Sequence, residues 1–145
     1  MSKHLVLYPE KCIGCQTCEF VCSYTHNKIF DTTLSSVHIV RYPELNVSIP
    51  SICLQCKDAT CEMVCPIHAI SHNQDGVVVI NYNTCITCRL CVNSCSTGNI
   101  RYSPITRTVY KCDLCMDNYP QCAKHCPSGA ISYLDQDMNT SKQVI

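Results

Sequence analysis

The segment CIGCQTCEFVC at residues 12–22 spaces four cysteines as C-x2-C-x2-C-x3-C. Residues 85–95 repeat this spacing, and residues 53–65 and 112–126 repeat it with a middle gap lengthened to four and six residues. We number these runs motifs 1 to 4 in chain order: residues 12–22, 53–65, 85–95 and 112–126. They account for all sixteen cysteines of the 145-residue chain. The quartet is therefore the repeated unit that organises the sequence.

The spacing within each motif has a chemical reason. Three thiolates on one tight loop reach three corners of a cube, and the x3 step begins a short helix that directs the fourth thiolate toward a second cube. Motifs 2 and 4 continue into Pro66 and Pro127, which lack an N–H and fix the direction of the chain at that exit. Ser23 and Ser96 stand at the corresponding positions of motifs 1 and 3. This pattern is typical of bacterial [4Fe–4S] ferredoxins, in which the fourth cysteine ligates the other cluster of a pair.

Composition narrows the class of protein. In a secreted chain, so many cysteines would indicate a disulfide scaffold, but residues 1–10 lack a secretory signal. We therefore expect a reducing cytoplasm, where clustered cysteines indicate metal. The formal net charge is zero, with no basic patch and no long apolar run, which favours neither nucleic acid nor a membrane as partner. The chain has no Trp and only two Phe, so a bound group must add to its stability.

Zinc is the main alternative ligand, because paired C-x2-C steps also build four-cysteine zinc sites. A third cysteine at x2 and a fourth at x3, followed by proline, are not the spacing of a zinc ribbon. A radical enzyme would leave one cluster with an open iron, whereas four quartets close four clusters. The pattern therefore favours electron transfer over catalysis, and the chain also lacks a flavin fingerprint, a phosphate loop and a nucleophile–base pair.

Other side chains beside the motifs have less specific interpretations. His26, His68 and His125 lie close to cysteines, and we expect them to donate hydrogen bonds or to be exposed rather than to ligate iron. The basic residues next to motif cysteines are Lys11, Arg89 and Lys111. Each of the three either offsets cluster charge or is a solvated side chain.

The connecting segments predict hairpins. Asp75-Gly76 lies between two stretches of β-forming residues and indicates a tight turn. Further short strands are expected at residues 37–42 and 47–52 around Pro43, at residues 100–102 and 108–110 around Pro104, and after residue 131. The expected fold is α+β, with short strands, short helices and many loops.

The pairing of the motifs has two solutions. In the nested solution, motifs 2 and 3 form an inner two-cluster ferredoxin-like unit at residues 49–99, and residues 1–48 plus 100–145 form an outer unit. In the tandem solution, motif 1 pairs with motif 2 and motif 3 with motif 4. We prefer the nested solution because the segment between motifs 2 and 3 contains the hairpin that a single ferredoxin unit needs.

The whole pattern resembles the four-cluster iron–sulfur subunits of oxidoreductase complexes, such as those of dimethyl sulfoxide reductase and formate dehydrogenase. Within that family, CIGCQTCEFVCSYTH at residues 12–26 and KCDLC at residues 111–115 look most similar to two groups. These are the small subunits of tungsten aldehyde oxidoreductases and of carbon monoxide dehydrogenases. The resemblance covers nearly the whole chain.

The resemblance implies crossed ligation of four [4Fe–4S] clusters, with the fourth cysteine of each motif serving its partner motif. We number the implied ligand sets 1 to 4: set 1 is Cys12, Cys15, Cys18 and Cys126; set 2 is Cys112, Cys115, Cys122 and Cys22; set 3 is Cys53, Cys56, Cys61 and Cys95; set 4 is Cys85, Cys88, Cys91 and Cys65.

It also implies a function. The chain is expected to be a non-catalytic electron-transfer subunit, a wire between a catalytic tungsten or molybdenum aldehyde oxidoreductase and a second redox partner. A ferredoxin, a flavoprotein subunit or a further copy of this chain could serve as that partner. Two alternatives remain open: a free polyferredoxin that shuttles electrons, and a partner of carbon monoxide dehydrogenase or hydrogenase.

Overall fold

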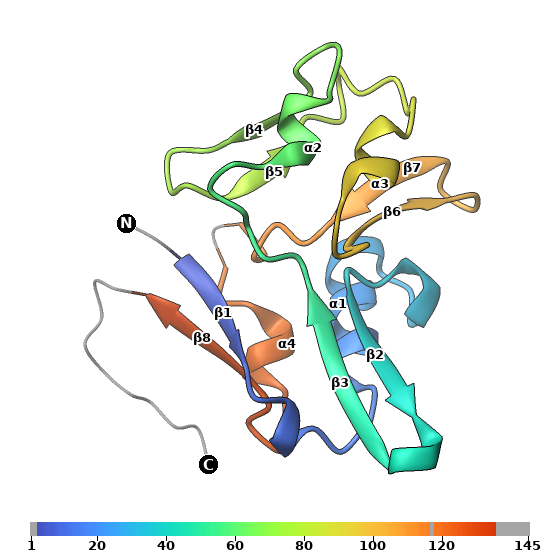
Figure 1. Ribbon diagram of the computed structural model, residues 1–145, viewed down its shortest axis with the longest axis vertical. Helices are drawn as coiled ribbons and strands as arrows, with labels where there is room; N and C mark the ends of the chain where they lie inside the picture. Colours follow the sequence, from blue (N-terminus) through green and yellow to red (C-terminus); the bar gives the residue numbers. More distant parts are fainter. Residues whose placement is uncertain (1–2, 117, 136–145) are drawn as a thin grey trace.

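A computed structural model describes residues 3–116 and 118–135. Short strands, short helices and many loops make up this part of the chain, as the sequence predicts (Figure 1). The strands are β1 Lys3–Leu7, β2 Val37–Tyr42, β3 Val47–Ile52, β4 Ile70–His72, β5 Val78–Ile80, β6 Ile100–Ser103, β7 Thr108–Lys111 and β8 Ile131–Asp135. The α-helices are α1 Thr17–Asn27, α2 Thr60–Met63, α3 Leu90–Ser94 and α4 Gln121–Lys124. The 3-10 turns are η1 Pro9–Lys11, η2 Thr32–Leu34 and η3 Pro43–Leu45.

The strands of the described residues pair as four separate two-stranded antiparallel sheets. Three are local hairpins, β2–β3, β4–β5 and β6–β7: the last two confirm the predicted hairpins, and the first confirms the two strands predicted around Pro43. In the β4–β5 turn the Asn73 side chain accepts hydrogen bonds from the amides of Asp75 and Val77, both at 2.9 Å. Gly76 adopts φ 76°, a conformation that glycine reaches without steric cost. The second strands of these hairpins, β3, β5 and β7, lead into motifs 2, 3 and 4.

The fourth sheet joins the two ends of the described chain, and the sequence did not predict it. β1 pairs with β8 in the register Leu5↔Tyr133 and Leu7↔Ile131. No turn links these strands, so no local signal marks their pairing. Leu5 and Leu7 pack on the core that holds Cys18 and Cys122. The sheet therefore brings motif 1 and motif 4 together.

The helices that follow the x3 step are short in motifs 2, 3 and 4, as predicted, but α1 in motif 1 has 11 residues. Ser23 keeps the N–H that Pro66 and Pro127 lack, which permits the α1 ladder to continue beyond Cys22; the serine is not sufficient, because Ser96 stands at the same position of motif 3 and α3 ends at Ser94. The helix ends where Lys28 turns into the left-handed region. Ser23, fully buried, donates to the Ile29 carbonyl and accepts from the Asp31 amide at 2.9 Å. The longer helix carries His26 toward motif 4.

The apolar side chains form two cores, and the cysteines are part of both. One core contains Cys18, Cys22, Val37, Ile52, Cys122 and Ile131. The other contains Ala59, Ile70, Val78, Cys91, Ile100 and Val109. In Figure 1 the elements around the first core, α1, α4, β1 and β8, lie in one half of the molecule, and α2 to β7 lie in the other.

The division at residues 48/49 and 99/100 stays a prediction. Ile100 and Val109, which it assigns to the outer unit, pack with Ile70 and Val78.

None of the helices within residues 3–116 and 118–135 is both long and apolar enough to span a bilayer.

Candidate iron–sulfur sites

Two of the four ligand sets line small cavities. Cys12, Cys15 and Cys18 share one cavity with Cys126, which arrives from the far end of the chain. A second cavity is lined by the four cysteines of ligand set 4, Cys65, Cys85, Cys88 and Cys91. In both cavities the fourth cysteine of one motif lies with the first three of another.

The remaining two sets are related by the electrostatic interactions of their thiols. Burial raises the pKa of Cys122 well above its ordinary value, and charge on Cys112, Cys22 and Cys115 raises it further. Burial likewise raises the pKa of Cys61; Lys111 opposes this effect, and charge on Cys53 and Cys95 adds to it. Cys22 thus interacts with each of the first three cysteines of motif 4, and Cys95 interacts with Cys61 of motif 2.

The helices bring cysteines of two different motifs together. Cys18 and Cys22 are four residues apart on α1, so their side chains lie on the same face, one turn apart. α1 packs against α4, which carries Cys122 and precedes Cys126. Two pairs of thiols thus lie across one helix–helix contact. α2 and α3 pack together in the same way between motifs 2 and 3.

The fourth cysteine of motifs 2, 3 and 4 is surrounded by hydrogen-bond donors from the loop that follows it. Burial raises the pKa of the Cys65 thiol, but backbone amides, including Ala69 N–H at 3.2 Å, outweigh it and leave the pKa lowered. The pKa values of Cys95 and Cys126 are lowered in the same manner: burial raises each, and donors near residues 97–100 and 128–131 outweigh it. Such donors stabilise thiolate sulfur and are typical of iron–sulfur ligands.

Motif 1 lacks this loop because α1 continues, and other groups supply the donors for Cys22. Burial raises the pKa of Cys22, whereas His26, the Ser36 amide and Ser35 lower it, and the pKa is lowered overall. The Ser36 amide lies 3.4 Å from Cys22 Sγ, and His26 Nδ1 lies 3.9 Å from the same atom. The sequence did not identify Ser35 and Ser36, since they follow the motif at a distance along the chain.

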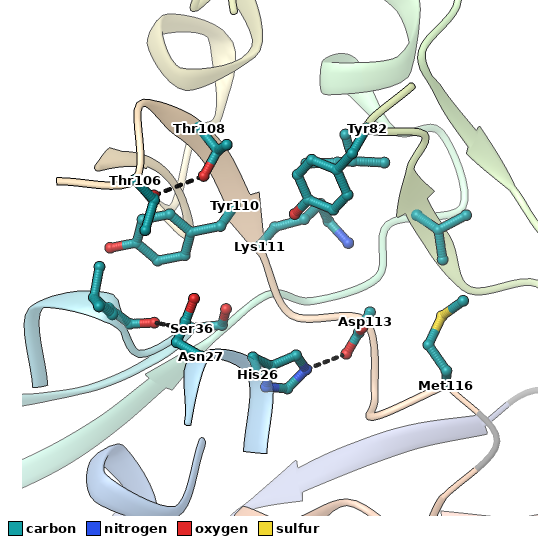
Figure 2. Close-up of a pocket in the computed structure, with 13 residues that line it drawn as sticks. His26, Asn27, Ser36, Tyr82, Thr106, Thr108, Tyr110, Lys111, Asp113 and Met116 are labelled. Carbon is teal, nitrogen blue, oxygen red and sulfur yellow. Dashed lines mark hydrogen bonds and ion pairs between the residues drawn. The ribbon is translucent and has the colours of Figure 1, made fainter. Parts of the chain in front are cut away.

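His26 bridges helix α1 and motif 4 (Figure 2). Its Nε2 lies 2.9 Å from Asp113 Oδ1, and its Nδ1 lies 2.9 Å from the Cys22 carbonyl oxygen. The hydrogen bond to Asp113 and that to Cys22 raise the pKa of His26 to about 11. His26, Asp113 and Cys115 bring ligand atoms within 4.8 Å of one another. Because Cys115 is one of the cysteines predicted for ligand set 2, this group of residues overlaps that predicted site. His68 and His125 are exposed.

Several thiols are held in surroundings that favour the protonated form. Burial, followed by the nearby Glu19 carboxylate, raises the pKa of Cys18 to about 12. Burial raises the pKa of Cys112 to about 12 and that of Cys91 to about 11. Metal binding requires the thiolate, so these groups ionise together with the arrival of iron.

The three basic residues beside motif cysteines have different surroundings. Lys11 is exposed and lies 4.4 Å from the centre of the Tyr8 ring. Arg89 is exposed and lies 3.8 Å from the centre of the Tyr102 ring. Lys111 is buried, with 6% of its surface exposed. The solvated interpretation thus fits Lys11 and Arg89 but not Lys111.

The donor set fits four [4Fe–4S] clusters. All sixteen cysteines are free thiols, and the backbone around them supplies N–H donors to sulfur. The anaerobically purified chain is therefore expected to hold about sixteen iron atoms and about sixteen sulfides. Colorimetric iron and sulfide assays on protein quantified by amino-acid analysis measure this. A value of about eight of each would contradict four clusters, and stoichiometric zinc without sulfide would contradict iron altogether.

Comparison with known proteins agrees with this donor set. Residues 46–136 match the family described as "4Fe-4S dicluster domain". The chain is 32% identical to "Electron transport protein HydN" of Escherichia coli (strain K12), over 94% of this chain and 90% of that protein. It is 38% identical to "Aliphatic sulfonate oxidoreductase, polyferredoxin-like subunit" of Pyrococcus furiosus, over 84% of this chain and 70% of that protein.

A solved structure has the same fold. A chain in the active site complex BamBC of benzoyl coenzyme A reductase with 1,5-dienoyl-CoA matches with a TM-score of 0.57 and 25% identity. The match covers 99% of this chain and 81% of that one.

Proposed function

This chain belongs to the 4Fe–4S dicluster family of electron-transfer proteins and holds four [4Fe–4S] clusters, and from that premise we propose that it is a wire between a catalytic oxidoreductase subunit and a second redox partner. The observation that carries the proposal is the closure of the quartets. The sixteen free thiols come from four motifs of four, and two of the four implied ligand sets line shared cavities, which supports four fully ligated clusters with no iron position left for a substrate. Each cluster supplies one-electron redox chemistry; the chain binds, spaces and shields the clusters and has no catalysis of its own.

Within this function we propose crossed ligation by ligand sets 1 to 4. The cavity shared by motif 1 and Cys126 supports set 1, and the cavity shared by motif 3 and Cys65 supports set 4. The electrostatic interactions of Cys22 and Cys95 support sets 2 and 3. This ligation makes two nested ferredoxin-like units.

The two units meet between ligand sets 2 and 3, so we propose that electrons cross the molecule in the order of sets 1, 2, 3 and 4, or the reverse. Gln55, in the loop of motif 2, donates to the Cys112 carbonyl of motif 4 at 2.8 Å. Charge on Cys53 also raises the pKa of Cys112, after the larger effect of burial. α1 and α4 join sets 1 and 2, and α2 and α3 join sets 3 and 4.

As the catalytic partner we propose a tungsten or molybdenum aldehyde oxidoreductase, working in the cytoplasm. The similarity of residues 12–26 and 111–115 to the small subunits of such enzymes supports this choice. The Pyrococcus furiosus relative is itself named as a polyferredoxin-like subunit of an oxidoreductase. A ferredoxin, a flavoprotein subunit or a second copy of this chain would take the other end.

Anaerobic affinity purification of the tagged chain from its own cells, with metal analysis of the co-purifying protein, tests the partner. We expect a second subunit at a fixed stoichiometry that contains tungsten or molybdenum. Nickel in that subunit would assign the chain to a carbon monoxide dehydrogenase or hydrogenase instead. Recovery of the chain alone, with all its iron, would assign it to a free polyferredoxin.

A further inference from the structure

Lys111 is a buried cation at the junction of the two units. It ends β7 and immediately precedes Cys112, and only 6% of its surface is exposed. In Figure 2 its side chain is directed from β7 past the ring of Tyr82. The ammonium donates to the Val78 carbonyl on β5, to the Cys112 carbonyl at 2.7 Å and to Gln55 Oε1 at 3.5 Å. All three acceptors are neutral.

The charge of Lys111 has no carboxylate partner within residues 3–116 and 118–135. The ion pairs found there join His26 to Asp113 and His72 to Glu62. Asp113 lines the same cavity of about 320 Å³ as Lys111, but its carboxylate is held 2.9 Å from His26 Nε2. A buried charge is costly unless an opposite charge compensates it. Besides Asp113 and the Tyr82 phenol, which line the same cavity, the groups that can become negative beside Lys111 are cysteine thiols.

Those thiols belong to two different ligand sets. The Lys111 ammonium donates to the Cys112 carbonyl of motif 4 and, at 3.5 Å, to the side chain of Gln55, which lies between Cys53 and Cys56 of motif 2. Cys112 is in ligand set 2, and Cys53 and Cys56 are in ligand set 3. Lys111 thus acts on both sides of the contact between the units.

Gln55 fixes this geometry. It lies between Cys53 and Cys56 of motif 2. Its Oε1 accepts a hydrogen bond from the Val78 amide at 3.0 Å, and its Nε2 donates one to the Cys112 carbonyl. The lysine ammonium therefore cannot swing into solvent without breaking a network that joins motif 2, β5 and motif 4.

We propose that Lys111 is the shared counter-charge of the clusters on ligand sets 2 and 3, and that it raises the reduction potentials of both above the values they would have without it. The proposal rests on the crossed ligation given above. Reduction adds a negative charge to a cluster, and a fixed cation nearby stabilises that charge, most strongly where water is excluded. Lys111 acts through its charge and does not ligate a cluster. Its effect stabilises an added electron on the two middle clusters of the wire, those on ligand sets 2 and 3.

Lys111→Met, analysed by EPR-monitored redox titration of the isolated, iron-replete chain, tests this. Two of the four midpoint potentials are expected to move to more negative values. We expect a change of about tenfold in each reduction equilibrium, or about 59 mV for a one-electron couple. Lys111→Arg keeps the charge and should leave all four potentials near those of the parent. Lys11→Met is the matched control, since Lys11 also precedes the first cysteine of a motif but is exposed.

If Lys111→Met does not assemble, Gln55→Glu replaces it, because a carboxylate beside the ammonium neutralises the same charge and should lower the same two potentials. Four unchanged potentials in either iron-replete variant would overturn the role of Lys111 and leave the electron-transfer function intact. An equal shift of all four would overturn it as well. Fewer than four clusters in the parent chain would instead overturn the proposed function.

Discussion

A Cys126→Ser substitution is expected to remove the cluster bound by the first three cysteines of motif 1. It should spare the cluster bound by the first three cysteines of motif 4, although Cys126 belongs to motif 4. Cys126 lies beyond the end of α4 and lines the cavity of Cys12, Cys15 and Cys18. Iron should fall from about sixteen to about twelve atoms per chain, because one of four cubes loses a ligand. The low-temperature EPR spectrum of the reduced protein should lose one component.

The matched comparison uses two further variants. Cys12→Ser should remove the same EPR component as Cys126→Ser, since both residues serve ligand set 1. Cys122→Ser should remove a different component, although Cys122 is only one helical turn from Cys126. A Cys126→Ser spectrum that coincides with that of Cys122→Ser would mean that each motif closes its own cluster.

Removal of iron is expected to unfold the chain. Two-stranded sheets are marginal by themselves in water, and the described residues contain four of them and no larger sheet. The largest side chains below 2% exposure are valines, a proline and serines, and cysteines occupy both cores. Little apolar burial therefore remains once the clusters are gone.

Anaerobic treatment with an iron chelator should accordingly abolish the cooperative thermal transition in far-UV circular dichroism and most protection from hydrogen exchange. Reconstitution with iron and sulfide under a thiol reductant should restore both. An apo-protein that keeps a cooperative transition and its protected amides would show that side-chain packing alone supports the fold.

Local features were predictable from the sequence because each has its cause within a few residues. Asp75-Gly76 sets the turn of the β4–β5 hairpin, and the x3 step starts the helices that present Cys61 and Cys122. The cysteine spacing identified the cluster type for the same reason, since the loop must fit the cube.

Non-local features escaped prediction. The pairing of β1 with β8 depends on residues at opposite ends of the chain. Ser23 stands where motifs 2 and 4 have a proline, and nothing local in the sequence showed that α1 would extend through it and bring His26 onto Asp113. Lys111 is buried because two units meet around it. The sequence could not distinguish it from Lys11, which also precedes the first cysteine of a motif but is exposed. Such differences arise only once distant segments meet.

The pairing of β1 with β8 also dictates an order of events during synthesis. Cys12, Cys15 and Cys18 emerge from the ribosome first, yet the wall that Cys126 and Ile131 complete around them is made more than a hundred residues later. At translation rates of about 5–20 residues per second, those thiols wait roughly five to twenty seconds in an unfinished cavity. The nascent chain meanwhile completes the shorter span from Cys53 to Cys95. Under the proposed crossed ligation, the inner clusters are therefore expected to be complete before the outer ones, and the waiting thiols of motif 1 to be the most exposed to oxidants during this interval.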